Sequence, residues 1–283
     1  MTQAIEMRPR FDVTSDDIEY LPGLLACVYQ PQGTGPFHAL IEIHGGAWNN
    51  NDRTQNAPMV QELASHGVVV ASIDFRLGRA GAYPRAMQDI NFATRWLKQH
   101  AADFNAVADA LGGLGLSSGG QQIMLSAMRP RDQRYCAIPL DAAPDLDASL
   151  AYVMMGWPVI DPHARYLHAR SRGRTQLLES HHRWFGDEDT MREANPQQIL
   201  ERGERVELPP ALIFQGADDD VLAPRTAERF VESYGQSGGI IELAKFPHAG
   251  HGYSRQGGPN ALRTVDLLNG FVERQLKAVA NNW

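Results

Sequence analysis

One short motif in the chain has the form of a serine nucleophile. Residues 115–119 read Gly-Leu-Ser-Ser-Gly, a G-x-S-x-G pentapeptide that follows an apolar run and precedes a helical pattern. A strand that turns directly into a helix forces its central residue into a strained conformation, and glycines at both ends leave room for that turn. The motif therefore predicts that Ser117 presents its hydroxyl at a sheet edge, although such pentapeptides also occur as ordinary turns.

A glycine-rich turn upstream of this motif has the form of an anion-binding site. Residues 44–48 read His-Gly-Gly-Ala-Trp and end an apolar run. Backbone N–H groups at such a turn can stabilise the oxyanion that forms when a nucleophile attacks a carbonyl. We expect these donors among Gly45, Gly46 and Ala47, together with the N–H of Ser118. A plain Gly-Gly turn is the alternative, but the two motifs in this order favour catalysis.

Carboxylates and imidazoles follow two later apolar runs. A serine hydroxyl becomes a good nucleophile when a neutral imidazole accepts its proton, and the imidazole needs a carboxylate to orient it. Chemistry alone does not choose among the adjacent acids. The candidates are Asp218, Asp219 and Asp220 after the first run, and His248 and His251 after the second.

Over nearly its whole length, the chain resembles the α/β-hydrolase superfamily, and within it the esterases similar to hormone-sensitive lipase and acetyl esterases. The order serine, aspartate, histidine is that of the superfamily. Its loops of the form G-x-x-D-x-x-V-x-P imply that Asp219, three residues after Gly216, is the acid. Its pattern F-P-x-x-x-H-G similarly implies His251 rather than His248 as the base.

The chain departs from these relatives at three positions of the two glycine-rich motifs. They typically show H-G-G-G and G-D-S-A-G, where this chain has Ala47, Leu116 and Ser118. Its H-G-G-x-W turn is similar to that of smaller esterases and formamidase-like enzymes. The resemblance implies that Ser117 attacks a carbonyl carbon with His251 as general base and Asp219 orienting it, and that an acyl-enzyme forms without a metal or organic cofactor.

Apolar runs alternate with helical patterns along the chain, as in βαβ units with a mostly parallel sheet. Helices are predicted after Pro84, after Pro224 and from Pro259. The fold class is therefore α/β, and the resemblance implies the α/β-hydrolase fold with helices flanking the sheet. The predicted strands are 24–29, 39–44, 68–74, 111–116, 135–140, 211–215 and 241–246.

The length of 283 residues would suit two domains at about 150 residues each. The candidate catalytic residues come from both halves and must meet at one site, so we expect a single domain over 1–283. Residues 142–210 exceed an ordinary connection and predict a cap or lid inserted in it. Several large side chains would line an acyl or alcohol pocket, unless they form the cap's own core. They are Trp48, Met154, Met155, Trp157 and Trp184.

Arginines gather within this predicted cap. Residues 163–184 hold five arginines and a single acid, Glu179. If the segment overlies the active site, it would favour substrates that bear a carboxylate, and a scattered basic surface is the alternative. The arginines are Arg165, Arg170, Arg172, Arg174 and Arg183.

Composition excludes several function classes. A formal net charge of −7, from 26 basic and 33 acidic side chains, argues against a nucleic-acid partner. Cys27 and Cys136 are too few and too isolated for a disulfide framework or a zinc site. The first residues show no apolar core of a signal peptide, and no run approaches the ~18 residues of a membrane span. We expect a cytoplasmic protein without a membrane partner; the oligomeric state stays open, a homodimer included.

The expected function is a serine carboxylic-ester hydrolase that acts on small to medium, fairly apolar esters. An amidase, formamidase or peptidase is the first alternative, because the same three residues can form an acyl-enzyme from an amide. A non-catalytic binding protein on the hydrolase scaffold is the second.

Overall fold

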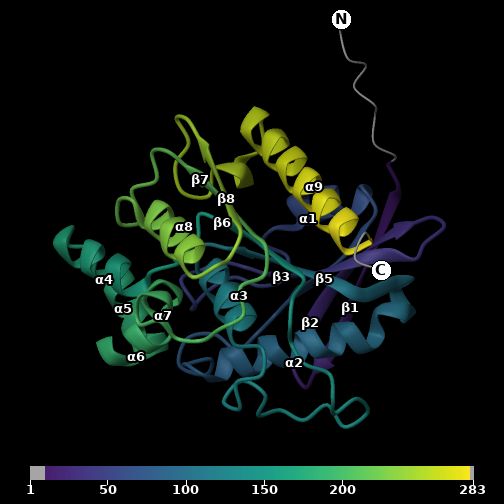
Figure 1. The fold of residues 1–283 in the computed structure, drawn as a ribbon, viewed down its shortest axis with the longest axis horizontal. Helices are drawn as coiled ribbons and strands as arrows, with labels where there is room; N and C mark the ends of the chain where they lie inside the picture. Colours follow the sequence, from purple (N-terminus) through teal and green to yellow (C-terminus); the bar gives the residue numbers. More distant parts are fainter. Residues whose placement is uncertain (1–9, 281–283) are drawn as a thin grey trace, which may run out of the picture.

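Residues 10–280, which the computed structural model describes, form an eight-stranded sheet with the order β1-β2-β4-β3-β5-β6-β7-β8 (Figure 1). β2 pairs antiparallel with both β1 and β4, and all other neighbours are parallel. The predicted α/β class is therefore confirmed. The strands are β1 (Asp12–Leu21), β2 (Leu24–Gln32), β3 (Phe37–Ile43), β4 (Val68–Ile73), β5 (Ala106–Leu116), β6 (Tyr152–Gly156), β7 (Ala211–Gly216) and β8 (Ile241–Phe246).

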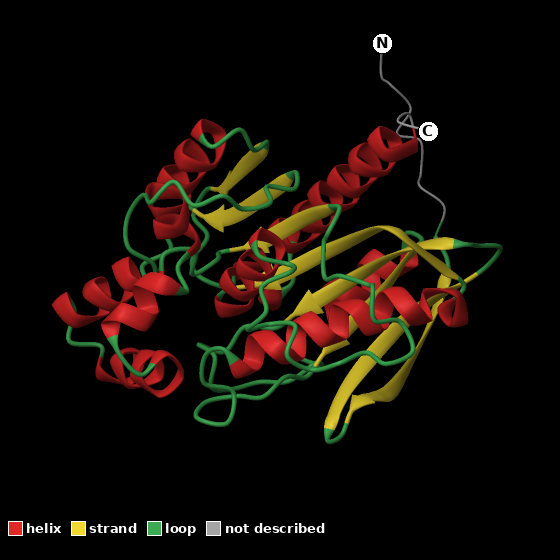
Figure 2. Ribbon diagram, turned by 60° about the horizontal axis from the view of Figure 1, so that its bottom comes forward, coloured by secondary structure: helices red, strands yellow, loops and turns green. Residues whose placement is uncertain are grey.

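Helices cover both faces of the sheet. One face packs on α1 (Ala57–Ser65) and α9 (Pro259–Ala280), the other on α2 (Arg85–His100), α3 (Ser118–Met128) and α8 (Thr226–Gln236). Figure 2 shows the sheet between the long helices α2 and α9. Along β3, Leu40 belongs to one apolar cluster and its neighbour Ile41 to the other, as expected for a strand buried on both faces.

Between β6 and β7, the chain leaves the sheet and forms four further helices. They gather as one group at one end of the molecule (Figure 1). The group, which we call the helical excursion, consists of α4 (Pro162–Ser171), α5 (Thr175–Phe185), α6 (Glu188–Glu193) and α7 (Pro196–Glu201). The 3-10 helices are η1 (Ala101–Phe104) and η2 (Tyr253–Gln256).

One predicted strand is wrong, and part of residues 142–210 belongs to the sheet. Residues 135–140 form a turn followed by irregular chain, and the strand beside β5 is β6 at Tyr152–Gly156. Pro139 lacks the N–H that an interior strand needs, and Ile138 gives its carbonyl to Arg95 at 2.7 Å. Because β6 lies within 142–210, the excursion starts after Gly156. The other six predicted strands correspond to β2, β3, β4, β5, β7 and β8.

β1 was not predicted because its side chains are largely polar and exposed, as in an edge strand. It pairs along β2 from Asp12 opposite Gln32 to Leu21 opposite Leu24. Among the described residues, no helix combines the length and apolar character that a membrane span requires.

The topology places four loops at one edge of the sheet. β3, β5, β7 and β8 run parallel, so the segments after their carboxyl ends lie at the same edge, where open α/β sheets bind ligands. Ile43 pairs with Gly115 and Gly216 with Phe246. This register sets the His-Gly-Gly turn against the serine motif, and the aspartate loop against the histidine loop.

Candidate active site

Ser117 lies on a strained turn between β5 and α3. Its φ of 55° and ψ of −116° are a conformation that side chains other than glycine rarely adopt. A Cβ on Gly115 would lie 2.3 Å from the Gly119 carbonyl oxygen, and one on Gly119 would lie 2.1 Å from that of Ile43. Both ends of the pentapeptide must therefore be glycine for the turn to close.

A line of hydrogen bonds runs from Ser117 to Asp219. Ser117 Oγ lies 2.9 Å from His251 Nε2, and His251 Nδ1 lies 2.9 Å from Asp219 Oδ2. Because a carboxylate can only accept, Nδ1 donates, which leaves Nε2 free to accept from the serine. The Val221 and Leu222 N–H groups bond to Asp219 Oδ1 at 3.0 and 3.3 Å. The side chain of Asp219 is fully buried, so its orientation is held on all sides.

The neighbouring acids and the other histidine lie outside this line. Asp218 is 65% exposed, and its carboxylate is 3.9 Å from His248, which is 95% exposed. Asp220 forms an ion pair of 2.6 Å with Arg174. The geometry thus brings Ser117 together with Asp219 and His251, the pair that the family patterns implied.

The His-Gly-Gly turn packs on the serine turn. The Trp48 N–H donates to Ser118 Oγ at 3.2 Å. Gly46 has a φ of 118°, and a Cβ there would lie 2.1 Å from the Asn50 carbonyl oxygen. Ala47 also adopts a positive φ, of 50°.

These contacts narrow the candidate oxyanion donors. The N–H of Gly45 bonds to Gln55 Oε1 at 3.1 Å, which removes Gly45 from the expected set. No described residue accepts a hydrogen bond from the N–H of Gly46, Ala47 or Ser118. Gly46 and Ala47 also line the cavity above Ser117, so these three N–H groups remain.

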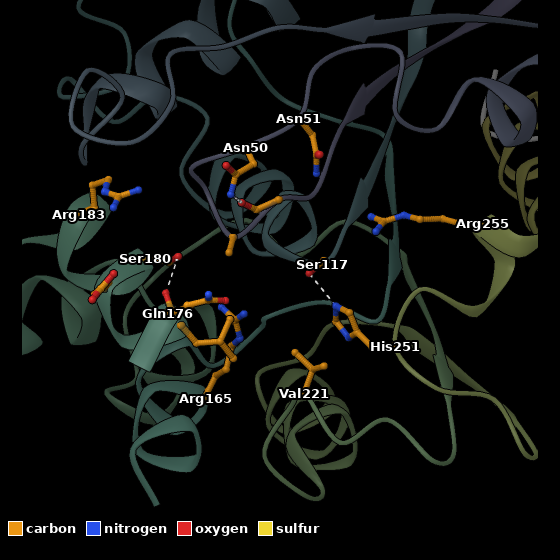
Figure 3. A pocket seen from close by; sticks show the side chains of 14 residues that line it. Asn50, Asn51, Ser117, Arg165, Gln176, Ser180, Arg183, Val221, His251 and Arg255 are labelled. Carbon is orange, nitrogen blue, oxygen red and sulfur yellow. Dashed lines mark hydrogen bonds between the residues drawn. The ribbon is translucent and has the colours of Figure 1, made fainter. Parts of the chain in front are cut away.

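A cavity of about 550 Å³ opens at Ser117, and Figure 3 shows the side chains around it. Its lining is largely polar. It comprises Gly46, Ala47, Asn50, Asn51, Ser117, Arg165, Gln176, Leu177, Glu179, Ser180, Arg183, Val221, His251 and Arg255.

The five expected pocket residues are not among those that line this cavity, and their contact with a substrate stays a prediction. Met154 and Met155 belong to β6 and are buried in the sheet core. Trp48 stacks on Trp184 with ring centroids 5.6 Å apart, while Trp157 packs edge-on to His251 at 6.3 Å. Burial of large apolar surface favours these side chains in the core, where they pack beneath the residues of the site.

Several cavity residues were not singled out from the sequence. Asn50, Asn51 and Arg255 lie in segments without a recognised motif. Of the five arginines in residues 163–184, Arg165 and Arg183 line the cavity, and the other three are absent from its lining. To predict that Arg165 points into the cavity, one would need to know that α4 begins at Pro162. The first residue of a helix determines on which side of the helix each later residue lies.

Glu42 is a buried carboxylate on β3, close to the site. Its Oε1 accepts from Asn56 Nδ2 at 2.7 Å, and no described residue bonds to Oε2. Burial raises the pKa of Glu42 from 4.5 to about 7, and the Asn56 hydrogen bond opposes this rise. The folded state thus binds the proton more tightly than the unfolded chain.

Glu42→Gln is expected to remove a loss of stability that the natural chain suffers as pH rises from about 4.5 to about 7. Above that window, the variant should be more stable by up to about 3 kcal/mol, since the unfolded carboxylate ionises freely and the buried one does not. Urea unfolding at pH 5 and pH 8 measures the difference. Glu242→Gln, at an exposed ion pair with Arg274, should show little dependence on pH; an equal difference for Glu42→Gln at both values would contradict the prediction.

Among the residues that the structure describes, no group of three or more His, Cys, Asp or Glu side chains is arranged to hold a metal ion.

The chain is similar to a known protein family and to curated esterases. The BD-FAE family model matches residues 27–234. Esterase LipC of Mycobacterium tuberculosis is 28% identical over 247 residues, which cover 85% of this chain and 59% of LipC. This chain therefore spans less than two thirds of the length of that relative.

Solved structures share the whole architecture. Esterase B from Lactobacillus rhamnosis superposes with a TM-score of 0.82 at 20% identity, covering 98% of this chain and 92% of that one. Esterase Est2 of Thermogutta terrifontis, solved with butyrate bound, gives a TM-score of 0.73 at 22% identity, covering 92% and 94%. These similarities establish the α/β-hydrolase fold.

Proposed function

Since the chain belongs to the BD-FAE family and has the α/β-hydrolase fold, we propose that it is a serine carboxylic-ester hydrolase. The observation that carries the proposal is the hydrogen-bonded line from Asp219 through His251 to Ser117, beside unpaired N–H donors in an open cavity. The names of its relatives, which include esterases, support the same reaction.

The reaction begins when Ser117 Oγ attacks the carbonyl carbon of the ester. His251 Nε2 takes the hydroxyl proton, and the Asp219 carboxylate stabilises the imidazolium that results. The carbonyl oxygen becomes negative and accepts from the N–H groups of Ser118 and of Gly46 or Ala47. One such donor is typically worth about 2.7–4 kcal/mol of transition-state stabilisation.

His251 then donates its proton to the leaving alcohol, and an acyl-enzyme remains on Ser117. In the second half, His251 accepts a proton from water, and the hydroxide attacks the acyl carbon. The acid product leaves and the serine regains its proton. The carboxyl group of Asp219 stays ionised throughout, because it only orients the imidazole and balances its charge.

The helical excursion acts as the cap of this single-domain hydrolase. Helices α4 and α5 contribute Arg165, Gln176, Leu177, Ser180 and Arg183 to the cavity lining. The cavity suits a small to medium ester, while its lining is more polar than the fairly apolar substrate expected from the sequence. Substrate choice therefore depends on the excursion as well as on the loops at the sheet edge.

A matched pair of substrates tests the proposed reaction against the amidase alternative. We expect kcat/KM for a p-nitrophenyl ester to exceed that for the p-nitroanilide of the same acid by about 100-fold or more, since an amine leaves only after His251 has protonated it. A series of acyl lengths run in parallel gives the usable size. Equal or faster cleavage of the anilide would assign an amidase, and hydrolysis of neither would assign a binding protein.

A further inference from the structure

Arg165 is a buried charge to which no described residue supplies a carboxylate or a side-chain hydrogen-bond acceptor. It extends from α4 into the cavity at Ser117 (Figure 3) and is 3% exposed. Its Nε and Nη1 are buried and have no hydrogen-bond partner, and the guanidinium forms no ion pair with any described residue. Removing an arginine from water without pairing it is costly, so this arrangement requires an explanation.

The surroundings hold the guanidinium in place without neutralising it. Its carbon lies 5.5 Å from the ring centre of Trp48, a favourable position for a cation. Burial lowers the pKa of Arg165 to about 10, which leaves it charged at neutral pH. Burial and the charge of Arg165 lower the pKa of His181 to about 3, so this neighbour stays neutral.

The nearest catalytic carboxylate is committed to other bonds. Asp219 attracts Arg165 at long range, but its two oxygens bond to His251 and to the N–H groups of Val221 and Leu222. Asp219 is therefore not the missing partner. The guanidinium stays open on the side of the cavity where a substrate would lie.

The rest of the cavity has the same electrostatic character. Arg183 and Arg255 also line it, against one acid, Glu179. Arg183 forms no ion pair with a described residue. The Arg255 guanidinium has a long contact of 3.5 Å with Gln55 and lies 5.6 Å from the ring centre of Trp157. With a neutral ester, the three cations of the lining would face a single acid, Glu179. An anionic ester would supply a second negative charge.

We propose that the substrate is an ester that also carries a carboxylate, and that the Arg165 guanidinium binds this carboxylate while Ser117 attacks the ester carbonyl. The inference rests on the proposed function and specifies its substrate class, for example the half-ester of a dicarboxylic acid. Arginine suits this role because two of its N–H groups can pair with both oxygens of a carboxylate. The carboxylate belongs to the acyl part or to the alcohol part of the ester.

Two pairs of esters test the proposal. Monomethyl adipate and dimethyl adipate differ by one charge on the acyl side, and 4-acetoxybutanoic acid and its methyl ester differ by one charge on the alcohol side. We expect the natural chain to prefer the charged member of at least one pair by tenfold or more in kcat/KM, followed in a pH-stat. The responding pair tells which part carries the carboxylate.

Arg165→Met should remove this preference, a loss of about tenfold or more in the ratio of the two kcat/KM values, because the carboxylate loses its partner in a buried charge pair. Arg165→Gln, which is closer in polarity, should reduce it in the same direction. Arg170→Gln is the matched control. It lies on the same helix with its side chain 57% exposed, and should leave the preference unchanged.

Thermal unfolding separates binding from a structural role. Removing an unpaired buried charge should leave Tm unchanged or raise it, and Arg165→Met with a lowered Tm and equal losses on both members of a pair would overturn the proposal. No preference for a charged ester in the natural chain would overturn it as well, and hydrolysis of the neutral esters would then leave the proposed function standing. Failure to cleave any of the four esters would reject both.

Discussion

Ser117→Ala is expected to lower kcat on a neutral ester by about 10⁶-fold, to the level that binding and the oxyanion donors can supply without a nucleophile. Alanine keeps the Cβ of serine, so the strained backbone conformation with a φ of 55° should stay the same. The N–H groups of Gly46, Ala47 and Ser118 are also unaffected. Steady-state kinetics and thermal unfolding together measure the effect.

The neighbouring hydroxyl provides the control for this experiment. Ser118→Ala keeps its backbone N–H and loses only the side-chain acceptor for the Trp48 N–H. One hydrogen bond of this kind is worth about 1 kcal/mol, so the loss should stay near tenfold or below. Comparable activity in the Ser117→Ala and Ser118→Ala variants would mean that Ser117 is not the nucleophile.

His251→Asn is expected to reduce kcat by a similar factor and to prevent rapid covalent labelling of Ser117 by a fluorophosphonate. The serine hydroxyl reacts with such a reagent only when a base takes its proton, and the asparagine amide cannot do so. Activity-based labelling followed by intact mass spectrometry counts the modified protein directly.

His248→Asn is the matched substitution. His248 is almost fully exposed and has a φ of 56°, a conformation that asparagine tolerates well. The labelling rate should therefore equal that of the natural chain. If the two asparagine variants were labelled at the same rate, the base would lie elsewhere.

The sequence was most informative where chemistry depends on local spacing. The strained turn at Ser117 requires glycines at 115 and 119, because a Cβ at either position would clash with a backbone carbonyl oxygen. The loops with Asp219 and His251 follow apolar runs that became β7 and β8. Such features involve a strand end and the few residues after it, so a short stretch of sequence is enough to predict them.

Features that depend on competition between distant segments could not be predicted in this way. Residues 135–140 and 152–156 are both short apolar runs, and only the second pairs between β5 and β7. Met154 and Met155 lie in the sheet core because their segment, and not residues 135–140, forms this strand. Arg165 required the packing of α4 against the turn at Trp48, a contact between residues more than a hundred positions apart.

The helical excursion leaves the sheet at β6 and rejoins it at β7, and these two strands are adjacent and paired, with Val153 opposite Ala211. Its two ends are therefore held together by the sheet, whatever the chain does between them. The entropic cost of lengthening such a closed loop grows only slowly. Mutation and insertion can thus remodel α4 and α5 while the strands that carry Ser117, Asp219 and His251 keep their register.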